Sequence, residues 1–98
     1  MKPCKRIEIV IEEPMAPKLV ELLDALHTPG YTILPNAAGD GDRGIRRADE
    51  LAGDSSNTVF IIACEDDALL DSIVAGVRPL LSRSGGICLI SEALFLKH

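Results

Sequence analysis

Residues 5–26 read KRIEIVIEEPMAPKLVELLDAL, and the spacing of their apolar side chains changes partway along this stretch. Ile7, Ile9 and Ile11 alternate with a second set of residues that includes two glutamates, and this period of two predicts a strand over residues 5–12. Pro14 and Pro17 end that strand, and Pro17 suits the first turn of a helix, where its missing N–H is not needed. The leucines that follow recur at helical spacing and fall at Leu19, Leu22, Leu23 and Leu26.

Two further strands and a second helix follow along the chain. Pro29-Gly30 stops the first helix, and residues 31–34 predict a short strand. Residues 58–64 contain an apolar run without alternation, which is typical of a strand that is buried on both faces or central in a sheet. The helix after it begins at three acidic residues, 65–67, where the helix dipole favours negative charge. Its apolar stripe comprises Leu69, Leu70, Ile73, Val74, Val77 and Leu80.

The end of the chain predicts one more strand and a fragment. Pro79 removes a backbone donor, so we expect the last turn of the second helix to be kinked or irregular. Ser84-Gly85-Gly86 ends that helix, and residues 87–90 predict a fourth strand. Glu92 interrupts it, and residues 93–96 predict a short, separate C-terminal strand. The order of elements is therefore β-α-β-loop-β-α-β with a tail strand.

This order predicts an α+β fold of the ferredoxin-like type, a βαββαβ sandwich in which two helices cover one face of an antiparallel sheet. A chain of 98 residues makes one domain, so residues 1–98 are expected to form a single unit. A long loop of about residues 36–57 separates strands two and three. Its 22 residues include four glycines and eight charges, and we expect it to be flexible. The sheet face without helices needs covering, which favours self-association.

Composition excludes several classes of function. The net charge of −5 at pH 7 and the absence of Trp argue against a nucleic-acid-binding protein. No apolar run approaches the ~20 residues that a membrane span needs. Acidic residues soon after the N-terminus do not fit a signal peptide, so we expect a cytoplasmic protein. The three cysteines, Cys4, Cys64 and Cys88, match no zinc-binding spacing, and we expect them to serve packing.

Catalytic groupings are sparse in this sequence. His27 falls at the end of the first helix, where an imidazolium would suit the helix dipole, and His98 is the last residue. Asp66 and Asp67 could ligate a metal, yet capping the second helix is the more common role for such residues. No Ser-His-Asp or Cys-His grouping is recognisable. We therefore expect a protein that is not an enzyme and has no metal site.

Two glycine-rich stretches suit an anion. Residues 39–47 combine three glycines with three arginines. Glycines let backbone N–H groups turn toward an anion, and the guanidinium groups of Arg43 and Arg46 offer planar forks that match phosphate. Residues 82–87 place two glycines and an arginine at a helix-to-strand junction. The alternatives are a flexible, solvated loop for the first stretch and an ordinary helix C-cap for the second.

Taken together, these segments make the chain resemble signalling proteins of the PII type over nearly all of its length. The resemblance is closer to the PII-like branch linked to bicarbonate transport and carboxysomes than to the nitrogen-sensing branch. The segments that carry it are Gly30-Tyr31-Thr32, Gly41-Asp42-Arg43-Gly44-Ile45-Arg46, Asn57-Thr58-Val59-Phe60, Ser84-Gly85-Gly86-Ile87 and Ile90-Ser91-Glu92-Ala93.

The resemblance implies a homotrimer that binds adenine nucleotides in the clefts between subunits. In that family the loop between strands two and three, the T-loop, changes order when ligand binds and contacts a target protein, and the turn before strand four cradles phosphate. The residues carried over by position are Arg43 and Arg46 for phosphate contacts, Gly39 and Gly41 for close backbone approach, Gly85, Gly86 and Ile87 for the phosphate turn, and Thr32, Ile61 and Ala63 for the adenine side.

Departures from the nitrogen-sensing branch bear on the ligand. That branch places two arginines on its last strand against the terminal phosphates of ATP, where this chain has Leu96 and His98. We therefore expect ADP or AMP to compete well with ATP, and cyclic AMP is a further candidate. The branch's loop glutamine and its modified tyrosine have no counterpart. Bicarbonate is implied as a second ligand, and a bicarbonate transporter or carboxysome-related protein as the partner in inorganic carbon uptake or fixation.

Two rival interpretations of the sequence remain open. A trimeric metal-binding protein resembling the CutA group would share the architecture and would use His, Cys and acidic ligands at subunit contacts. A weak nucleotidase would need a general base, and none is recognisable in the sequence.

Overall fold

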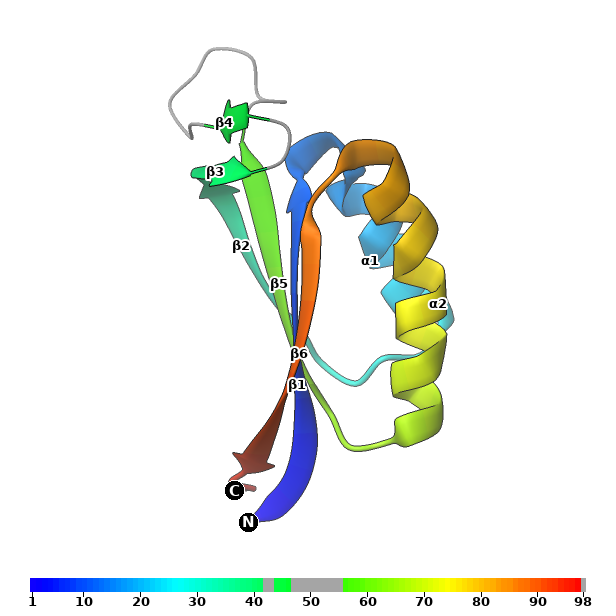
Figure 1. Ribbon diagram of the computed structural model, residues 1–98. Helices are drawn as coiled ribbons and strands as arrows, with labels where there is room; N and C mark the ends of the chain where they lie inside the picture. The colour runs from blue at the N-terminus through cyan, green and yellow to red at the C-terminus, as the bar shows by residue number, and fades with distance from the viewer. Residues whose placement is uncertain (42–43, 47–55, 98) are drawn as a thin grey trace.

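The computed structural model describes residues 1–41, 44–46 and 56–97. Two helices cover one face of a sheet and leave the other face bare, as Figure 1 shows. This arrangement confirms the ferredoxin-like βαββαβ fold. The elements are β1 (Lys2–Glu12), the short 3-10 helix η1 (Glu13–Met15), α1 (Ala16–Ala25), β2 (Thr32–Ala37), β3 (Gly39–Gly41), β4 (Gly44–Arg46), β5 (Asn57–Cys64), α2 (Asp67–Ser84) and β6 (Ile87–Phe95).

The main sheet has four antiparallel strands in the order β2-β5-β1-β6. β1 and β5 are central, and β2 and β6 form the two edges. The apolar run of residues 58–64 therefore does lie in a central strand, as expected. Within β5 burial alternates along the strand: Phe60 and Ile62 are buried on the helix side, and Ile61 is half-buried on the bare side.

The core lies between the sheet and the two helices. Both apolar periods predicted from residues 5–26 contribute to it, because the isoleucines of β1 and the leucines of α1 face each other. Burying these aliphatic side chains stabilises the fold by about 1.5–3 kcal/mol per side chain. The fully buried large side chains are Phe60, Ile7, Ile9, Ile11, Leu19, Leu23, Ile62, Ile73 and Val77.

Helix α2 is more regular than predicted, and strand β6 is longer than predicted. α2 continues through Pro79 to Ser84, because the proline ring sits on an exposed position and removes a single donor near the helix end. β6 runs unbroken from Ile87 to Phe95, so the predicted interruption at Glu92 and the separate tail strand were wrong. Glu92 is tolerated within the strand because its side chain is 86% exposed on an edge strand, where its carboxylate also binds Nζ of Lys5, its register partner on β1, at 3.0 Å.

The loop between strands two and three contains more regular structure than its sequence predicted. β2 continues to Ala37, and β3 and β4 form a separate two-stranded antiparallel sheet. Two residues separate these strands, a connection length that favours antiparallel pairing. The assignment of residues 36–57 as a patternless loop was therefore wrong for residues 39–41 and 44–46.

The ends of both helices match the sequence-based interpretation. Oδ1 of Asp66 accepts a hydrogen bond from the backbone N–H of Ala68 at 2.9 Å, so Asp66 is the N-cap of α2. His27 follows the end of α1 with φ of +56°, and its backbone N–H donates to the carbonyl oxygen of Asp24. Asp66 therefore caps α2 through its side chain, whereas His27 closes α1 through its backbone, and the favourable interaction of its imidazolium with the helix dipole stays a prediction.

Candidate functional site

The first part of the candidate site is the β3–β4 ribbon. Gly39 pairs with Arg46, and Gly41 pairs with Gly44. The fold thus brings three of the predicted site residues, Gly39, Gly41 and Arg46, into one small antiparallel unit at the end of the sheet opposite to the chain termini (Figure 1). Arg43, the other predicted arginine, lies outside the described residues.

The chain leaves the main sheet through an irregular stretch of β2. The pairing of β2 with β5 shifts register between Leu34 and Ala37, and Asn36 has φ of +60°. Such a shift bends the strand and re-aims the residues that follow it. The bend therefore directs β3 away from the main sheet.

The chain returns to the sheet at a hydrogen-bonded anchor. Oγ of Ser56, which is buried, donates to Oε2 of Glu13 at 2.6 Å. The backbone N–H of Glu13 donates in turn to the carbonyl oxygen of Ser56 at 3.0 Å. Glu12 and Asn57 are register partners directly beside this anchor. The end of the long loop is thus fixed to the segment that joins β1 to α1.

The second part of the candidate site is the turn between α2 and β6. Gly85 and Gly86 have φ of +78° and +116°, which side chains on L residues rarely permit. A Cβ on Gly86 would collide with the carbonyl oxygen of Val10. Ile87, the next residue, is the register partner of Val10. The turn therefore rests directly on the backbone of the central strand β1.

The same turn also closes the end of α2. The backbone N–H of Gly85 donates to the carbonyl oxygen of Leu81 at 2.8 Å. Oγ of Ser84 contacts the carbonyl oxygens of Leu80, at 3.1 Å, and Gly85, at 2.9 Å. The C-cap interpretation is thus correct, and it is compatible with a phosphate role because these bonds hold the glycine backbone in place.

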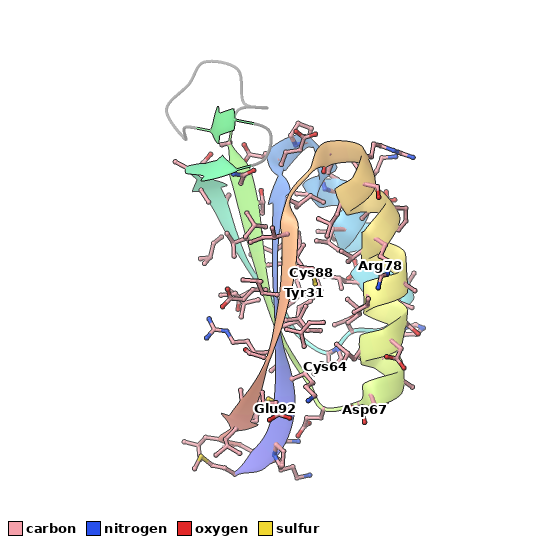
Figure 2. All side chains as sticks on the ribbon, in the orientation of Figure 1. Tyr31, Cys64, Asp67, Arg78, Cys88 and Glu92 are labelled. Atoms are coloured by element: carbon pink, nitrogen blue, oxygen red, sulfur yellow. The ribbon has the colours of Figure 1, made fainter. Side chains whose placement is uncertain are left out.

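An apolar groove begins at this turn and follows β6. Its volume is about 430 Å³. Arg78 on α2 and Cys88 on β6 belong to its lining and are labelled in Figure 2. Partial burial raises the pKa of the Cys88 thiol, which favours its neutral form. The lining residues are Val74, Val77, Arg78, Leu81, Gly86, Ile87, Cys88, Leu89 and Ile90.

The third part of the candidate site lies at the β2 side of the sheet. Thr32 and Ile61 are register partners, and Ala63 is two residues further along the same face of β5. Tyr31, directly before β2, donates a hydrogen bond of 2.8 Å to Oδ1 of Asp24, and this bond raises the pKa of Tyr31. The predicted adenine-side residues therefore lie close together.

One chain does not bring these parts into a single site. Thr32 is on the edge strand β2, whereas Ile87 is on the opposite edge strand β6. Three strand spacings separate the two edges, which corresponds to roughly 14 Å. Within one chain, the predicted adenine side and the phosphate turn therefore lie at different parts of the sheet.

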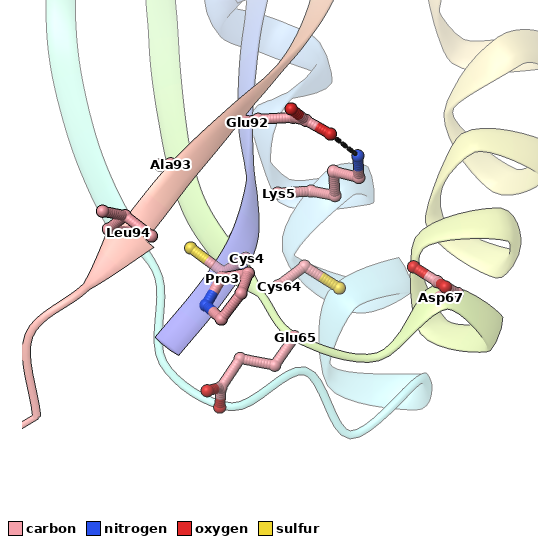
Figure 3. A pocket seen from close by; sticks show the side chains of 9 residues that line it. All are labelled: Pro3, Cys4, Lys5, Cys64, Glu65, Asp67, Glu92, Ala93 and Leu94. Atoms are coloured by element: carbon pink, nitrogen blue, oxygen red, sulfur yellow. Dashed lines mark hydrogen bonds and ion pairs between the residues drawn. The ribbon is translucent and has the colours of Figure 1, made fainter. Parts of the chain in front are cut away.

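A larger pocket lies at the other end of the molecule and contains none of the predicted site residues. Its volume is about 510 Å³, and it is lined by Pro3, Cys4, Lys5, Cys64, Glu65, Asp67, Glu92, Ala93 and Leu94. Figure 3 shows the thiols of Cys4 and Cys64 pointing away from each other. Both cysteines are buried and form no disulfide, and Sγ of Cys64 donates to the carbonyl oxygen of Asp66 at 3.3 Å.

Neither a metal centre nor a membrane-spanning helix is found in the described part of the chain. Over residues 1–41, 44–46 and 56–97, no three side chains of His, Cys, Asp or Glu gather in a way that could hold a metal ion. Within the same ranges, no helix combines the length and the apolar character needed to cross a bilayer.

Sequence reasoning missed two contributors to the site. The partner of Ser56 is Glu13, 43 residues earlier, and nothing in the local sequence of either residue indicates the contact. The role of Val10 is carried by its backbone carbonyl, so its side-chain identity gives no signal. Both contacts arise only once β1 lies between β5 and β6.

Comparison with known proteins agrees with the ferredoxin-like fold of the chain. The family model described as "Nitrogen regulatory protein P-II" matches residues 4–97. No curated protein sequence matches the chain. The fold of the chain is similar to that of CPII, a nitrogen regulatory PII-like protein from Thiomonas intermedia K12, in structures bound to ADP and bicarbonate and to ADP, AMP and bicarbonate.

The similarity to these structures spans most of both chains. For the complex of CPII with ADP and bicarbonate the identity is 26%, the TM-score is 0.81, and 95% of this chain and 88% of that chain are covered. For the complex with ADP, AMP and bicarbonate the identity is 25%, with the same TM-score and coverage. A PII-like signalling protein from Thermus thermophilus is 25% identical, with a TM-score of 0.76 and coverage of 97% of this chain and 91% of that chain.

Proposed function

We propose that this chain, which belongs to the nitrogen regulatory protein P-II family, is a regulatory sensor of adenine nucleotides and not an enzyme. The observation that carries the proposal is the turn at Gly85 and Gly86. Both residues have positive φ, and the turn rests on the carbonyl of Val10. The N–H of Gly85 is bonded to Leu81, and the backbone that follows it at Gly86 is held in a shape that can present an N–H group to a phosphate.

The division of the site between the two sheet edges supports a homotrimer with nucleotides at inter-subunit clefts. A ring of three copies needs a head-to-tail contact between two different surfaces of the chain. We assign these surfaces to the two edges of the sheet, so that one edge meets the opposite edge of the next copy. Such a contact would bring the turn beside β6 of one copy toward Thr32, Ile61 and Ala63 of its neighbour. The bare sheet face would be covered in the same assembly.

The proposed preference is for ADP or AMP over ATP. Leu96 occupies a position where the nitrogen-sensing branch carries an arginine, and it is apolar and 77% exposed. Lys97 beside it is already engaged, because its Nζ binds Oε2 of Glu65 at 3.2 Å. Fewer cations near a third phosphate would leave its charge less compensated. Phosphate contacts are assigned to Arg43 and Arg46, with close backbone approach at Gly39 and Gly41.

Bicarbonate is the proposed second ligand. CPII from Thiomonas intermedia K12, which shares this fold, binds ADP and bicarbonate together. We extend this property to the present chain, and we assign it a cytoplasmic role in the control of inorganic carbon uptake or fixation. The order of the T-loop, residues 36–57, would report the bound state to a transporter or carboxysome-related partner.

Calorimetric titration tests this function directly. AMP, ADP, ATP and cyclic AMP are each titrated with and without bicarbonate, into the wild type and into the double variant Arg43→Ala/Arg46→Ala. The double variant should lose most of its ADP affinity and remain trimeric, whereas the matched control Lys18→Ala, an exposed cation on α1, should bind like the wild type. Unchanged ADP affinity in the double variant would contradict the assigned phosphate contacts.

A further inference from the structure

The bare face of the sheet is largely apolar. Leu34, Ile87 and Leu89 on this face are each about half exposed, at 48%, 49% and 54%. The strand register places its central residues in three rows across the sheet, and the polar pair Glu12 and Asn57 follows beyond the first of these rows. These rows are Leu34–Val59–Val10–Ile87, then Thr32–Ile61–Glu8–Leu89, then Ala63–Arg6–Ser91.

An ion pair stands in the middle of this face. A guanidinium nitrogen of Arg6 lies 2.6 Å from Oε1 of Glu8, and both residues belong to the central strand β1. Glu8 is flanked by Ile61 on one side and Leu89 on the other. The side chains of Arg6 and Glu8 are 51% and 32% exposed in the single chain. Covering the face would therefore remove water from two opposite charges set among aliphatic side chains.

Once Arg6 and Glu8 lose contact with water, the groups that bind their charges decide whether the covered face is stable. A buried ion pair is tolerated when further hydrogen bonds satisfy its remaining donors and acceptors, and removing one partner leaves an uncompensated charge. The guanidinium has five N–H donors, and the described contact uses one of its nitrogens. A second carboxylate can thus bind the same guanidinium, and a second guanidinium can bind the same carboxylate.

A second copy of the chain offers these groups in the required place. Arg6 and Glu8 carry opposite charges on one face of one strand, so the face is complementary to itself. The apolar row that ends at Ile87 continues the contact on one side of the pair. The aliphatic side chains around the pair match the apolar character of self-association interfaces, in which Arg is also enriched.

We propose that Arg6 and Glu8 determine the specificity of self-association, with the guanidinium of Arg6 in one copy binding the carboxylate of Glu8 in the next. This inference rests on the proposed homotrimer and adds to it the residues that select the partner. Copies join when the charges occur in this order along β1. A chain that carries the same two charges in the reverse order meets like charges and is excluded.

Exchange of the two charges provides the test. The variant Arg6→Glu/Glu8→Arg keeps both charges and reverses their order, so it should form trimers with itself. When it is co-expressed with wild-type chains of different mass, mixed trimers should be at least about tenfold rarer than random mixing gives, because like charges across an interface are strongly unfavourable. Native mass spectrometry measures the proportions.

A matched control is available on the other side of β1. The ion pair between Lys5 and Glu92 spans two strands at 3.0 Å and lies outside the bare face. The variant Lys5→Glu/Glu92→Lys should form trimers and mix freely with the wild type. Free mixing of this control, together with exclusion of the Arg6/Glu8 exchange variant, assigns the selectivity to the pair on the bare face.

Single substitutions keep the test decisive if the exchange variant folds poorly. Arg6→Met and Glu8→Gln should each weaken trimer association by at least about tenfold, whereas Arg6→Met/Glu8→Leu should assemble as well as the wild type. Free mixing of the exchange variant, or unchanged association of both single variants, would overturn the inference and leave the homotrimer intact. A wild-type chain that is monomeric in dilute solution would overturn the homotrimer itself.

Discussion

Ser56 and Glu13 hold each other through two hydrogen bonds, although 43 residues separate them in the chain. The side chain of Ser56 donates to the carboxylate of Glu13, and the backbone N–H of Glu13 donates to the carbonyl oxygen of Ser56. The first bond is charge-assisted and therefore short, at 2.6 Å. This pair fixes the return of the long loop to the sheet independently of the β3–β4 ribbon.

Ser56→Ala should destabilise the fold. The substitution removes the donor to a partly buried carboxylate, and losing such a bond costs about 1–3 kcal/mol. Urea denaturation followed by circular dichroism measures the free energy of unfolding. Ser72→Ala, at an exposed position on α2, is the control and should change it by less than about 0.5 kcal/mol. Equal effects from both substitutions would show that the anchor contributes nothing.

Gly86→Ala should be more harmful than Gly30→Ala. Both glycines have positive φ, but a Cβ at Gly30 would meet nothing within 4 Å, whereas one at Gly86 would strike the carbonyl of Val10. The φ of +54° at Gly30 lies in the left-handed region and costs roughly 1–2 kcal/mol for an alanine, whereas the φ of +116° at Gly86 lies outside that region and adds backbone strain to the collision. Thermal unfolding of the two variants measures the combined extra cost at Gly86. ADP affinity should fall in Gly86→Ala and persist in Gly30→Ala.

Asp66→Ala should destabilise α2 by about 1 kcal/mol, the usual effect of losing an N-cap. Asp67→Ala, one residue later in the first turn of the helix, should cost about 0.3 kcal/mol through the helix dipole. Hydrogen exchange of amides in the first turn of α2 reports the local effect. The prediction fails if these amides are equally protected in the two variants.

Tyr31 should titrate above the ordinary tyrosine value of 10.0, because its hydroxyl donates to Asp24. It is the sole tyrosine and the chain has no Trp, so the ultraviolet absorbance change on ionisation belongs to this residue. The pKa is raised by folding, so the contribution of this bond to stability is present below the unfolded-state pKa and is lost as pH rises through the folded-state pKa.

Asp24→Ala tests the cause of this shift. The variant should bring the pKa of Tyr31 back toward its ordinary value, since the hydrogen bond and the negative charge both disappear. Glu21→Ala, an exposed carboxylate one turn earlier on α1, serves as the control and should leave the titration unchanged. A raised pKa that persists in Asp24→Ala would assign the shift to burial instead.

Local sequence patterns correctly predicted the helices, strands and turns that are determined by residues close together in the sequence. The alternation of Ile7, Ile9 and Ile11 defined β1, and the two glycines before Ile87 marked the turn that closes α2. Element order then gave the ferredoxin-like topology, because two strand–helix–strand units leave few arrangements. These predictions needed no information about distant contacts.

The errors arose where a distant partner decides the structure. From the sequence alone, Glu92 was predicted to interrupt a strand, because its register partner Lys5 is distant in the chain. Ser56 was assigned to a loop, because its contact with Glu13 is visible only in the fold. The separation of Thr32 from Ile87 is likewise a property of strand order. Sequence patterns therefore identified the parts of the candidate site, and the topology shows that Thr32 and Ile87 lie on opposite edge strands of one sheet.

The contact between Gly86 and Val10 has a consequence for divergence among related chains. One side of this contact is a main-chain carbonyl, and the other is a position without a side chain. Exchange of Val10 for other aliphatic residues therefore leaves the backbone carbonyl that contacts the turn in place. Mutational drift can replace most of the neighbouring side chains and preserve the local geometry, provided that residue 86 stays glycine.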